Sequence, residues 1–285
     1  MEPLMLIDYE QDIDLTTHEQ VHVPLQPSSE PASCDRVDAK LVVMLPGAFH
    51  TGKTFAPLQT VLEKAGVETM AVTLETENLE ATSETDAVQV AEAIGDRTGV
   101  VVFAWSRGVE TLVRLPRHLK NGQLEGAIVM GSGGPHEYLL PSEQETQSAN
   151  PRYNKEYRTG MVPVKDKSGL YLYDSKAARH FFYHDLPYDS AAEALEQMVP
   201  QRQFVPDVPL APWDPELPTL LLLGRSDRVL EVARARAVGR RYFHANTEMI
   251  VGGHSLHISQ AEVLGNRILQ FIDDDLPLKD TIRLT

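Results

Sequence analysis

The chain has 285 residues, of which 42% are hydrophobic, and this is enough for one large domain or one domain with an insertion. Its 26 basic and 41 acidic residues leave a net charge of -15, which argues against nucleic acid and anionic membranes as partners. The single cysteine, Cys34, excludes an internal disulfide framework and a multi-cysteine metal site. Because there is also no basic leader and no long apolar segment, we expect a cytoplasmic protein without a membrane span.

Apolar patterning predicts an α/β fold with a mostly parallel central β-sheet and helices on both faces. Residues 1–39 differ from the rest and predict edge strands at 3–9 and 18–25, followed by a Pro/Ser-rich linker. Continuous apolar runs then predict buried strands at 40–45, 68–74, 99–105, 124–130 and 219–223. Apolar residues at three- and four-residue spacing predict helices at 55–65, 82–97, 107–120, 229–241 and 257–272. This alternation is typical of a parallel sheet buried on both faces.

Residues 135–217 interrupt the alternation and are predicted to form an inserted helical cap, or lid. The segment contains two predicted helices, at 175–185 and 189–199, before a Pro-rich exit. The core would then consist of residues 1–134 and 218–285. The aromatic residues of the cap, which could line a pocket or simply attach the cap to the sheet, are Tyr171, Tyr173, Phe181, Phe182, Tyr183 and Tyr188.

Residues Gly47 to Thr54 match the phosphate-binding P-loop pattern GxxxxGK[ST], directly after a predicted strand and before a helix. Taken alone, the motif predicts an NTPase. A P-loop also needs a later strand that ends in an acid to hold magnesium, and the strands at 99–105 and 124–130 do not end in one. Phe49 and His50 are also bulky for a loop whose amides must wrap a phosphate. We therefore keep the P-loop as an alternative only.

A second segment predicts a nucleophile. The run Val-Val-Val-Phe-Ala-Trp-Ser-Arg-Gly ends near Ser106, with Ala104 and Gly108 two residues away on either side. A serine on a sharp turn from a strand into a helix needs small neighbours at these positions, because larger side chains would collide with both elements. The pattern is typical of a nucleophile elbow, although Ser106 would serve equally as an ordinary helix N-cap. The motif alone leaves both interpretations open.

Partners for Ser106 follow in the order that an elbow requires. Acyl transfer needs two backbone N–H donors for the oxyanion, and the sequence positions of Ala48 and Arg107 match them. Asp227 comes just after the strand at 219–223, and His254 lies on a Gly-Gly loop before the last helix. The order serine, acid, histidine favours Ser106 as a nucleophile.

Other acids and histidines compete for these roles. Asp207 and Asp214 lie in the Pro-rich cap exit, which is typical of solvated turns. His257 follows His254 by three residues and is expected in the first turn of the last helix. The histidines predicted to have packing or hydrogen-bonding roles are His136, His180 and His184.

Four segments together resemble those of capped α/β-hydrolases, in particular the esterase and hydroxynitrile lyase group that includes plant methyl esterases and small bacterial esterases. They read Leu-Pro-Gly-Ala-Phe-His-Thr-Gly, Phe-Ala-Trp-Ser-Arg-Gly, Leu-Gly-Arg-Ser-Asp-Arg-Val and Gly-Gly-His-Ser-Leu-His. The cap stretch Phe-Phe-Tyr-His-Asp-Leu-Pro also looks similar. The chain departs from the group at Pro46, Ala104 and Arg107, where histidine, glycine and an apolar residue are usual. Arg107 opens a helix, where a positive charge opposes the helix dipole, so we expect a local carboxylate partner or a contact with substrate.

The resemblance implies an α/β-hydrolase fold and a serine esterase or lactonase with the triad Ser106, His254 and Asp227. The amides of Ala48 and Arg107 would hold the oxyanion, and no cofactor or metal is expected. The scarcity of cationic motifs predicts a small, largely apolar ester or lactone as substrate, and the oligomeric state stays open. Residues predicted to line the substrate pocket are Phe49, Trp105, His136, Phe182 and Tyr183. A lyase, a carbon–carbon bond hydrolase and a small-molecule receptor on the same fold remain as alternatives.

Overall fold

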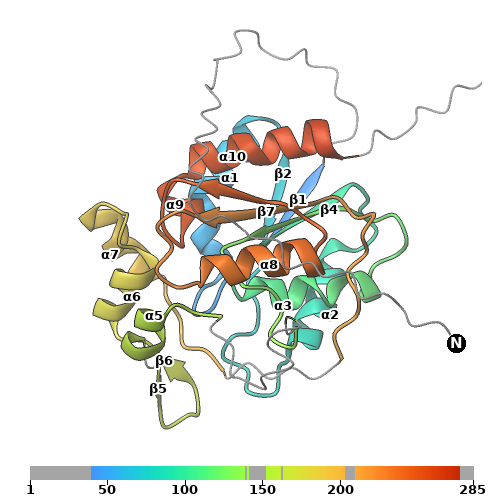
Figure 1. Cartoon of the computed structure of the whole chain (residues 1–285). Coiled ribbons are helices and arrows are strands. Elements are labelled where there is room, and N and C mark those ends of the chain that lie inside the picture. Colours follow the sequence, from blue (N-terminus) through green and yellow to red (C-terminus); the bar gives the residue numbers. More distant parts are fainter. Residues whose placement is uncertain (1–39, 139, 141–151, 162, 203–208, 277–285) are drawn as a thin grey trace, which may run out of the picture. The chain divides into compact units, whose positions relative to one another are not determined.

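The computed structural model describes residues 40–138, 140, 152–161, 163–202 and 209–276, and the structural statements below concern these residues. The predicted strands at 3–9 and 18–25, the linker, Cys34 and Asp207 lie outside them. Six strands form one sheet in which every pairing is parallel (Figure 1). In spatial order they are β2 (Glu68–Ala71), β1 (Leu41–Leu45), β3 (Val100–Trp105), β4 (Leu124–Met130), β7 (Thr219–Gly224) and β8 (Thr247–Ile250).

Both faces of this sheet are buried, because successive side chains of each strand point to opposite sides. In β1, Leu41, Val43 and Leu45 enter one hydrophobic cluster, whereas Val42 and Met44 enter another. The first cluster is covered by α2 (Ser83–Ile94), α3 (Gly108–Leu112) and α8 (Val232–Tyr242). The second is covered by α1 (Ala56–Lys64), α9 (Leu256–Ser259) and α10 (Ala261–Gln270). The predicted parallel sheet with helices on both faces is confirmed.

Two of the predicted helices are broken in the structure. The helix predicted at 107–120 is α3 followed by the 3-10 turn η2 (Leu115–His118). Pro116 explains the break, because it lacks an N–H and its ring would collide with the carbonyl of Leu112 in a continuous helix. The helix predicted at 257–272 is divided into α9, α10 and a closing π-helical turn, η3 (Phe271–Asp275). A 3-10 turn, η1 (Gly52–Phe55), also precedes α1.

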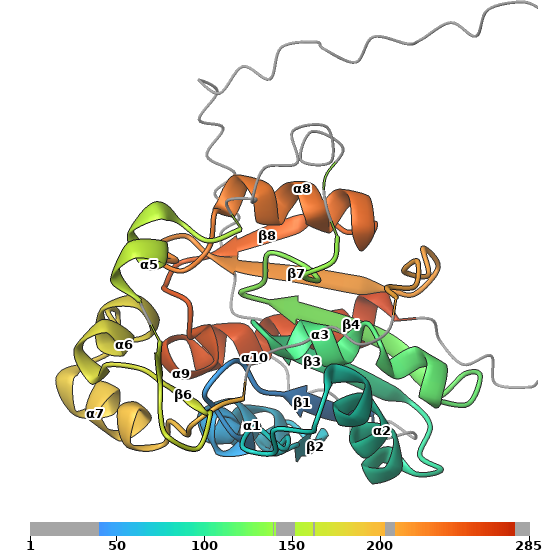
Figure 2. The same cartoon turned by 90° about the horizontal axis from the view of Figure 1, so that it is seen from below.

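Between β4 and β7 the chain leaves the sheet, and we call residues 152–202 the insertion. It contains α5 (Lys155–Gly160), an antiparallel hairpin of β5 (Val164–Lys165) and β6 (Tyr171–Leu172), α6 (Ser175–Phe182) and α7 (Tyr188–Glu196). The last two helices fall where the sequence predicts helices, whereas α5 and the hairpin are not predicted. Figure 2 shows α5, α6 and α7 beyond the end of the sheet to which the strand arrows point. The insertion therefore lies over the carboxyl ends of the strands, where α/β proteins bind ligands.

The insertion has apolar packing of its own. Asp174 caps α6, since its side chain accepts a hydrogen bond from the amide of Ala177 at 2.9 Å. Phe181 and Phe182 of this helix are buried in a third cluster, which also contains Leu223 at the end of β7. The insertion is thus attached to the sheet by shared apolar contacts as well as by the chain.

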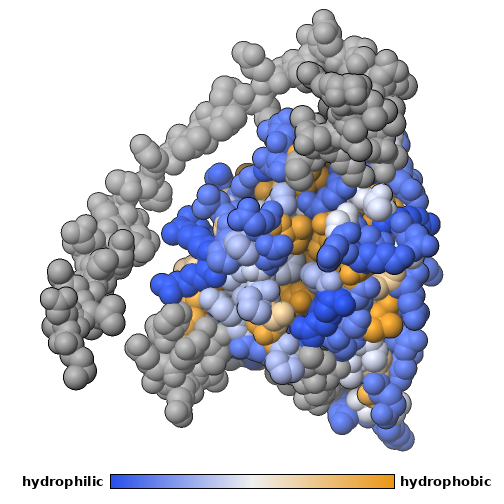
Figure 3. Space-filling model, turned by 90° about the vertical axis from the view of Figure 1, so that its right-hand side faces the viewer, coloured by the Kyte–Doolittle hydropathy of each residue, from blue (hydrophilic) through white to orange (hydrophobic). Residues whose placement is uncertain are grey.

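The face of the molecule shown in Figure 3 is mainly hydrophilic, with separate smaller apolar areas. This matches the chain's large excess of acidic residues. Within the described residues, no helix is long and apolar enough to cross a membrane.

Candidate active site

Ser106 lies on the turn between β3 and α3 with a positive φ of 51°, a strained conformation for a residue other than glycine. Its amide donates to the carbonyl of Met130 at 2.8 Å, which fixes the turn against β4. The small residue predicted at 108 is required, because a Cβ on Gly108 would lie 2.5 Å from the carbonyl oxygen of Leu45. Strain of this kind is typical of a nucleophile elbow, and a simple N-cap serine does not need it.

A continuous chain of hydrogen bonds joins Ser106 to the predicted histidine and acid. The Oγ of Ser106 lies 3.0 Å from Nε2 of His254, and Nδ1 of the same imidazole lies 2.8 Å from Oδ2 of Asp227. Both His254 and Asp227 are buried. The structure therefore brings together three residues that are 148 and 27 positions apart in the chain.

Asp227 is held as a carboxylate. Burial raises its pKa, but the attraction of His254, the hydrogen bond from that imidazole and two amide hydrogen bonds outweigh burial and lower the pKa below its ordinary value. The amides belong to Val229 and Leu230, which donate to Oδ1 at 2.7 and 3.1 Å. Because a carboxylate only accepts, Nδ1 of His254 carries the proton and Nε2 is left to accept one from Ser106.

The loop that carries His254 is fixed by three neighbours. The indole of Trp105 donates to the carbonyl of His254 at 3.0 Å, and Asp185 of the insertion accepts from the amide of Gly253 at 2.6 Å. The amide of Ser226 donates to the carbonyl of Gly252 at 3.0 Å. The position of the imidazole thus depends on β3, on the insertion and on the turn after β7.

The loop after β1 lies beside Ser106, as expected for an oxyanion loop. Gly47 is required there, because a Cβ on it would meet the Trp105 ring at 3.0 Å. Phe49 has a positive φ of 66°, and its amide donates to Oε1 of Gln201 at 2.6 Å. Its carbonyl accepts from the amide of Val199 at 2.9 Å. The insertion therefore holds both backbone groups of Phe49, directly after Ala48.

His50 links the same loop to α6. Its Nδ1 lies 2.6 Å from the carbonyl of Ala48, and its Nε2 is hydrogen-bonded to the hydroxyl of Tyr183. Burial lowers the pKa of His50 from 6.5 to about 4, so the ring is neutral near pH 7. A carbonyl only accepts, so Nδ1 donates to Ala48 and Nε2 accepts from Tyr183. The orientation of the Ala48 peptide thus depends on a residue of the insertion.

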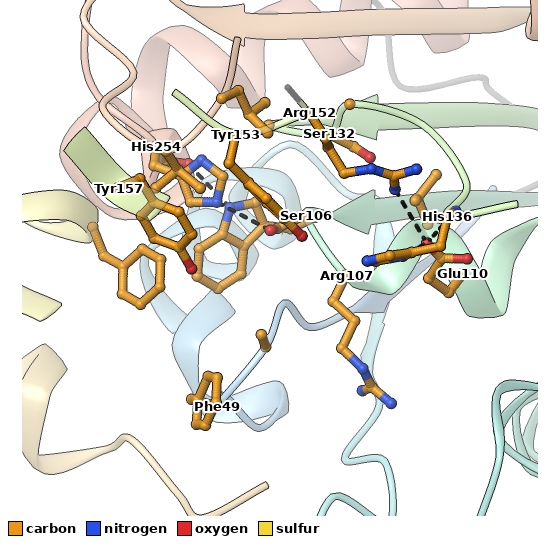
Figure 4. Close-up of a pocket in the computed structure, with 18 of the residues that line it drawn as sticks. Phe49, Ser106, Arg107, Glu110, Ser132, His136, Arg152, Tyr153, Tyr157 and His254 are labelled. Atoms are coloured by element: carbon orange, nitrogen blue, oxygen red, sulfur yellow. Dashed lines mark hydrogen bonds and ion pairs between the residues drawn. The ribbon is translucent and has the colours of Figure 1, made fainter. Parts of the chain in front are cut away.

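A pocket of about 300 Å³ opens beside Ser106. Its aromatic lining includes Phe49, Trp105, Tyr153, Tyr157, Tyr173 and Phe182. Figure 4 shows Tyr157 on the His254 side of Ser106, with Phe49 and Arg107 away from that imidazole. Burial raises the pKa of Tyr173 to about 12, so the phenol is neutral at physiological pH. Tyr153 and Tyr157 were not among the predicted pocket residues, since no motif surrounds them.

Four of the five predicted pocket residues line this pocket, and Tyr183 does not. The four are Phe49, Trp105, His136 and Phe182. Tyr183 is fully buried and lies next to the loop after β1 as the partner of His50. Tyr183 follows directly after α6, and the ring of its neighbour Phe182 takes the pocket side instead.

The other histidines considered above, and Asp214, are not part of the hydrogen-bonded chain of Ser106, His254 and Asp227. His136 is hydrogen-bonded through Nδ1 to Glu110, and His257 through Nε2 to Thr54 at 2.9 Å. His180 packs edge-on against Phe181. Asp214 is exposed and accepts from the amide of Glu216 at 2.9 Å, as in a solvated turn. Neither nitrogen of His184 has a hydrogen-bond partner among the described residues.

The predicted P-loop segment is not shaped to hold a phosphate. Gly52 packs against β2, where an added Cβ would lie 2.7 Å from the carbonyl oxygen of Ala71. Lys53 is exposed, and the hydroxyl of Thr54 is used by His257. In the described part of the chain, no group of three or more His, Cys, Asp or Glu side chains could hold a metal ion.

Charged residues also form part of the pocket wall. Among the described residues, Arg107, Arg152, Arg202 and Glu110 line it. Arg107 has the carboxylate partner expected from its place at a helix start, since its Nη2 lies 3.6 Å from Oδ2 of Asp86 on α2. Burial lowers the pKa of Arg107 to about 10, so the guanidinium keeps its charge at physiological pH.

A family model described as "Alpha/beta hydrolase family" matches residues 42–266, and no curated protein matches the chain. Among solved structures, a pyrethroid hydrolase from Sphingobium faniae JZ-2 is 18% identical, with a TM-score of 0.65 over 83% of this chain and 98% of that one. A methylesterase from Arabidopsis is 14% identical, with a TM-score of 0.63 over 82% and 99%. Polyneuridine aldehyde esterase is also 14% identical, with a TM-score of 0.64 over 82% and 99%. At such identities the similarity is one of fold.

Proposed function

Because the chain belongs to the alpha/beta hydrolase family, we propose that it hydrolyses a carboxylic ester or lactone of a small molecule. Ser106 is the nucleophile, His254 the general base and Asp227 the residue that orients it. The observation that carries this proposal is the hydrogen-bonded chain from Ser106 through His254 to Asp227, which begins at a residue with a φ of 51°. The names of the similar structures, a pyrethroid hydrolase and two esterases, support ester cleavage.

In the first step, Oγ of Ser106 attacks the ester carbonyl carbon while its proton passes to Nε2 of His254. The carbonyl oxygen becomes an oxyanion, which accepts from the amides of Ala48 and Arg107. The imidazolium is stabilised by the carboxylate of Asp227, which keeps its charge throughout. Collapse of the intermediate breaks the bond to the alcohol oxygen, which takes the proton from Nε2, and leaves an acyl group on Ser106.

In the second step, water takes the place of the alcohol. His254 removes its proton, the water oxygen attacks the acyl carbon, and the same two amides hold the second oxyanion. Breakdown returns the proton to Oγ of Ser106 and releases the carboxylic acid. Each bond that forms or breaks involves only substrate, water and these side chains.

The insertion acts as the cap of this site. Tyr157, Tyr173 and Phe182 come from it and contribute to the pocket lining. Aromatic rings over the reacting carbonyl exclude bulk water, which strengthens the hydrogen bonds to the oxyanion. Substrate choice therefore depends on the insertion more than on the sheet.

The test combines turnover with active-site labelling. Wild type should cleave p-nitrophenyl esters, and Ser106→Ala should lower kcat/KM by about 10³-fold or more. A p-nitrophenyl alkylphosphonate should add one phosphonyl group to wild type, at the peptide that contains Ser106. Ser132→Ala removes another serine of the pocket lining and should still be labelled. Ester cleavage that survives Ser106→Ala would overturn the assignment.

Turnover and labelling, together with thermal stabilisation by nucleotide, separate the alternatives. A receptor on this fold would take the label at Ser106 but turn over no ester beyond one equivalent. A lyase or a carbon–carbon bond hydrolase would be labelled without burst release from p-nitrophenyl esters. An NTPase would be stabilised thermally by magnesium nucleotide, and Lys53→Ala would abolish this effect.

A further inference from the structure

The pocket wall is positively charged although the chain as a whole is strongly acidic. The net charge of the chain is -15, yet among the described residues the pocket is lined by three arginines and one carboxylate. A cleft lined by one sign of charge in a low-dielectric wall attracts ligands of the opposite sign. A buried cation that is not fully compensated is costly to keep, so its presence in a ligand pocket points to a role in binding.

Two of the arginines share one buried carboxylate. Asp86 lies 2.7 Å from Nη2 of Arg202 and 3.6 Å from Nη2 of Arg107 through the same oxygen, Oδ2. All three side chains are at least nine-tenths buried, at 1%, 1% and 6% exposure for Asp86, Arg202 and Arg107. Nη1 of Arg202 has no hydrogen-bond partner among the described residues. The formal charges of the trio sum to one net positive charge, and in the described part of the chain Arg202 keeps one guanidinium nitrogen without a partner.

Two other described acids lie near this trio, and each also interacts with other groups. The negative charge of Glu75 raises the pKa of Asp86. Glu75 is exposed to solvent, however, and accepts a hydrogen bond from the side chain of Asn78 at 2.6 Å. The negative charge of Glu110 raises the pKa of Arg107, but Glu110 is also close to other cations. Arg114 and Arg152 lie 3.6 and 3.8 Å from it.

Arg152 is held differently from the pair at Asp86. Its Nη1 and Nη2 donate to the carbonyls of Gly134 and Pro135, both at 2.7 Å. Its donors therefore fix the loop after β4. Arg107 and Arg202, which share Asp86, are the other two arginines that line the pocket among the described residues.

We propose that Arg107 and Arg202 form a subsite for an anionic group of the substrate, and that this group is a carboxylate. The inference rests on the proposed esterase function and names its substrate class, namely monoesters of dicarboxylic acids. Guanidinium groups match carboxylates in planar, bidentate geometry. One net positive charge on the trio matches one carboxylate, whereas a phosphate monoester would bring nearly two negative charges.

The carboxylate belongs to the acyl half of the ester. In the proposed mechanism the alcohol leaves on the side of His254, which gives it a proton. The acyl group therefore extends away from the imidazole. Figure 4 shows the Arg107 side chain extending away from His254, on the far side of Ser106. Because the amide of Arg107 would hold the oxyanion, its guanidinium lies within one side-chain length of the ester carbonyl.

The kinetic test compares two esters of the same length, mono-p-nitrophenyl adipate and p-nitrophenyl hexanoate, at a pH where the free carboxyl is ionised. The measured quantity is the ratio of kcat/KM for the anionic ester to that for the neutral one. Wild type should prefer the anionic ester by about tenfold to hundredfold, the usual effect of a charge-assisted hydrogen bond. A ratio at or below one in wild type would overturn the proposal.

Substitutions of the two arginines and of Asp86 should change this ratio in opposite directions. Arg202→Gln and Arg107→Gln should each lower the ratio by about tenfold, because each removes one cation and keeps the backbone amides. Asp86→Asn should raise it, because it frees both guanidinium groups with little change of shape. Arg241→Gln, an exposed position on α8 that changes the net charge by the same amount, should leave it unchanged. A ratio that moves equally in Arg202→Gln and Arg241→Gln would show that overall charge, and not the subsite, is responsible.

Binding is tested without turnover, so that the two proposals can fail separately. Calorimetry with Ser106→Ala should detect adipate, and hexanoate should bind at least tenfold more weakly. Arg202→Gln in the same background should remove the difference. Adipate binding without ester turnover in wild type would refute the esterase and keep the subsite. Turnover that depends on Ser106, with no difference between the two acids, would refute the subsite alone.

Discussion

Tyr183→Phe removes a single oxygen atom from the fully buried residue that donates to His50. The substitution leaves Nε2 of His50 as a buried acceptor without a donor, and His50 is itself 1% exposed. Such a loss costs about 1–3 kcal/mol, which corresponds to about 2–4 °C in Tm per kcal/mol for a protein of this size. His50 also loses one of the two hydrogen bonds that hold its ring, so the Ala48 peptide is less firmly oriented. Because the oxyanion amide is displaced but not removed, we expect kcat to fall by about tenfold, against 10²–10³-fold for a deleted donor.

The assay is kcat and KM on a p-nitrophenyl ester, together with Tm. Tyr242→Phe is the control, because Tyr242 at the end of α8 is also a buried residue and its hydroxyl donates to the carbonyl of Ala211 at 3.0 Å. Both variants should lose stability, and only Tyr183→Phe should lose kcat at an unchanged KM. Equal effects of the two variants on kcat would refute the link between the insertion and the oxyanion loop.

Three further predictions follow from the same geometry. Asp227→Asn should lower kcat by about 10³–10⁴-fold with the fold intact by circular dichroism, because it removes the charge that orients His254; a loss under tenfold would contradict this role. Gly108→Ala should reduce the free energy of unfolding by about 1–3 kcal/mol in urea titrations, because its Cβ would meet the backbone of Leu45 at 2.5 Å; an unchanged midpoint would be inconsistent with the contact. Burial holds the pKa of His50 at about 4 in the folded state, below its ordinary 6.5. Only the unfolded chain is protonated between these values, so this residue should remove about 3 kcal/mol of stability as the pH falls from 6.5 to 4. Urea titrations across this range should give a shallower pH dependence for His50→Gln, and identical slopes would count against the assignment.

Much of the sheet could be predicted because most of its strands are short apolar runs, whereas β8, which reads Thr-Glu-Met-Ile at the edge of the sheet, was not predicted. The runs at 40–45, 124–130 and 219–223 agree with β1, β4 and β7 to within one residue. Helix ends were predicted less well, as at 107–120, where Pro116 breaks a pattern that apolar spacing alone continues.

The serine, acid and histidine could be placed because their order along the chain is itself informative. The rest of the pocket could not be predicted, since Arg152, Tyr153 and Arg202 have no motif around them and meet only when the insertion folds over the sheet. For the same reason, the substrate predicted from the sequence is largely apolar although arginines line the pocket. Arg107 alone stood out in the sequence, because a cation at a helix start calls for a compensating acid.

The hydrogen bonds of the insertion bear on the order in which the site is completed during folding. Asp185 holds the His254 loop, Tyr183 and Gln201 hold the oxyanion loop, and the amide of Asn154 donates to Val229 beside Asp227 at 3.0 Å. The elbow at Ser106, by contrast, is bonded to β4 within the sheet. A newly made chain would therefore form its nucleophile with the sheet and gain a working site only after residues 152–202 dock. Until then it would be unable to attack esters indiscriminately, and a graft of a foreign insertion onto this sheet would have to supply all four hydrogen bonds.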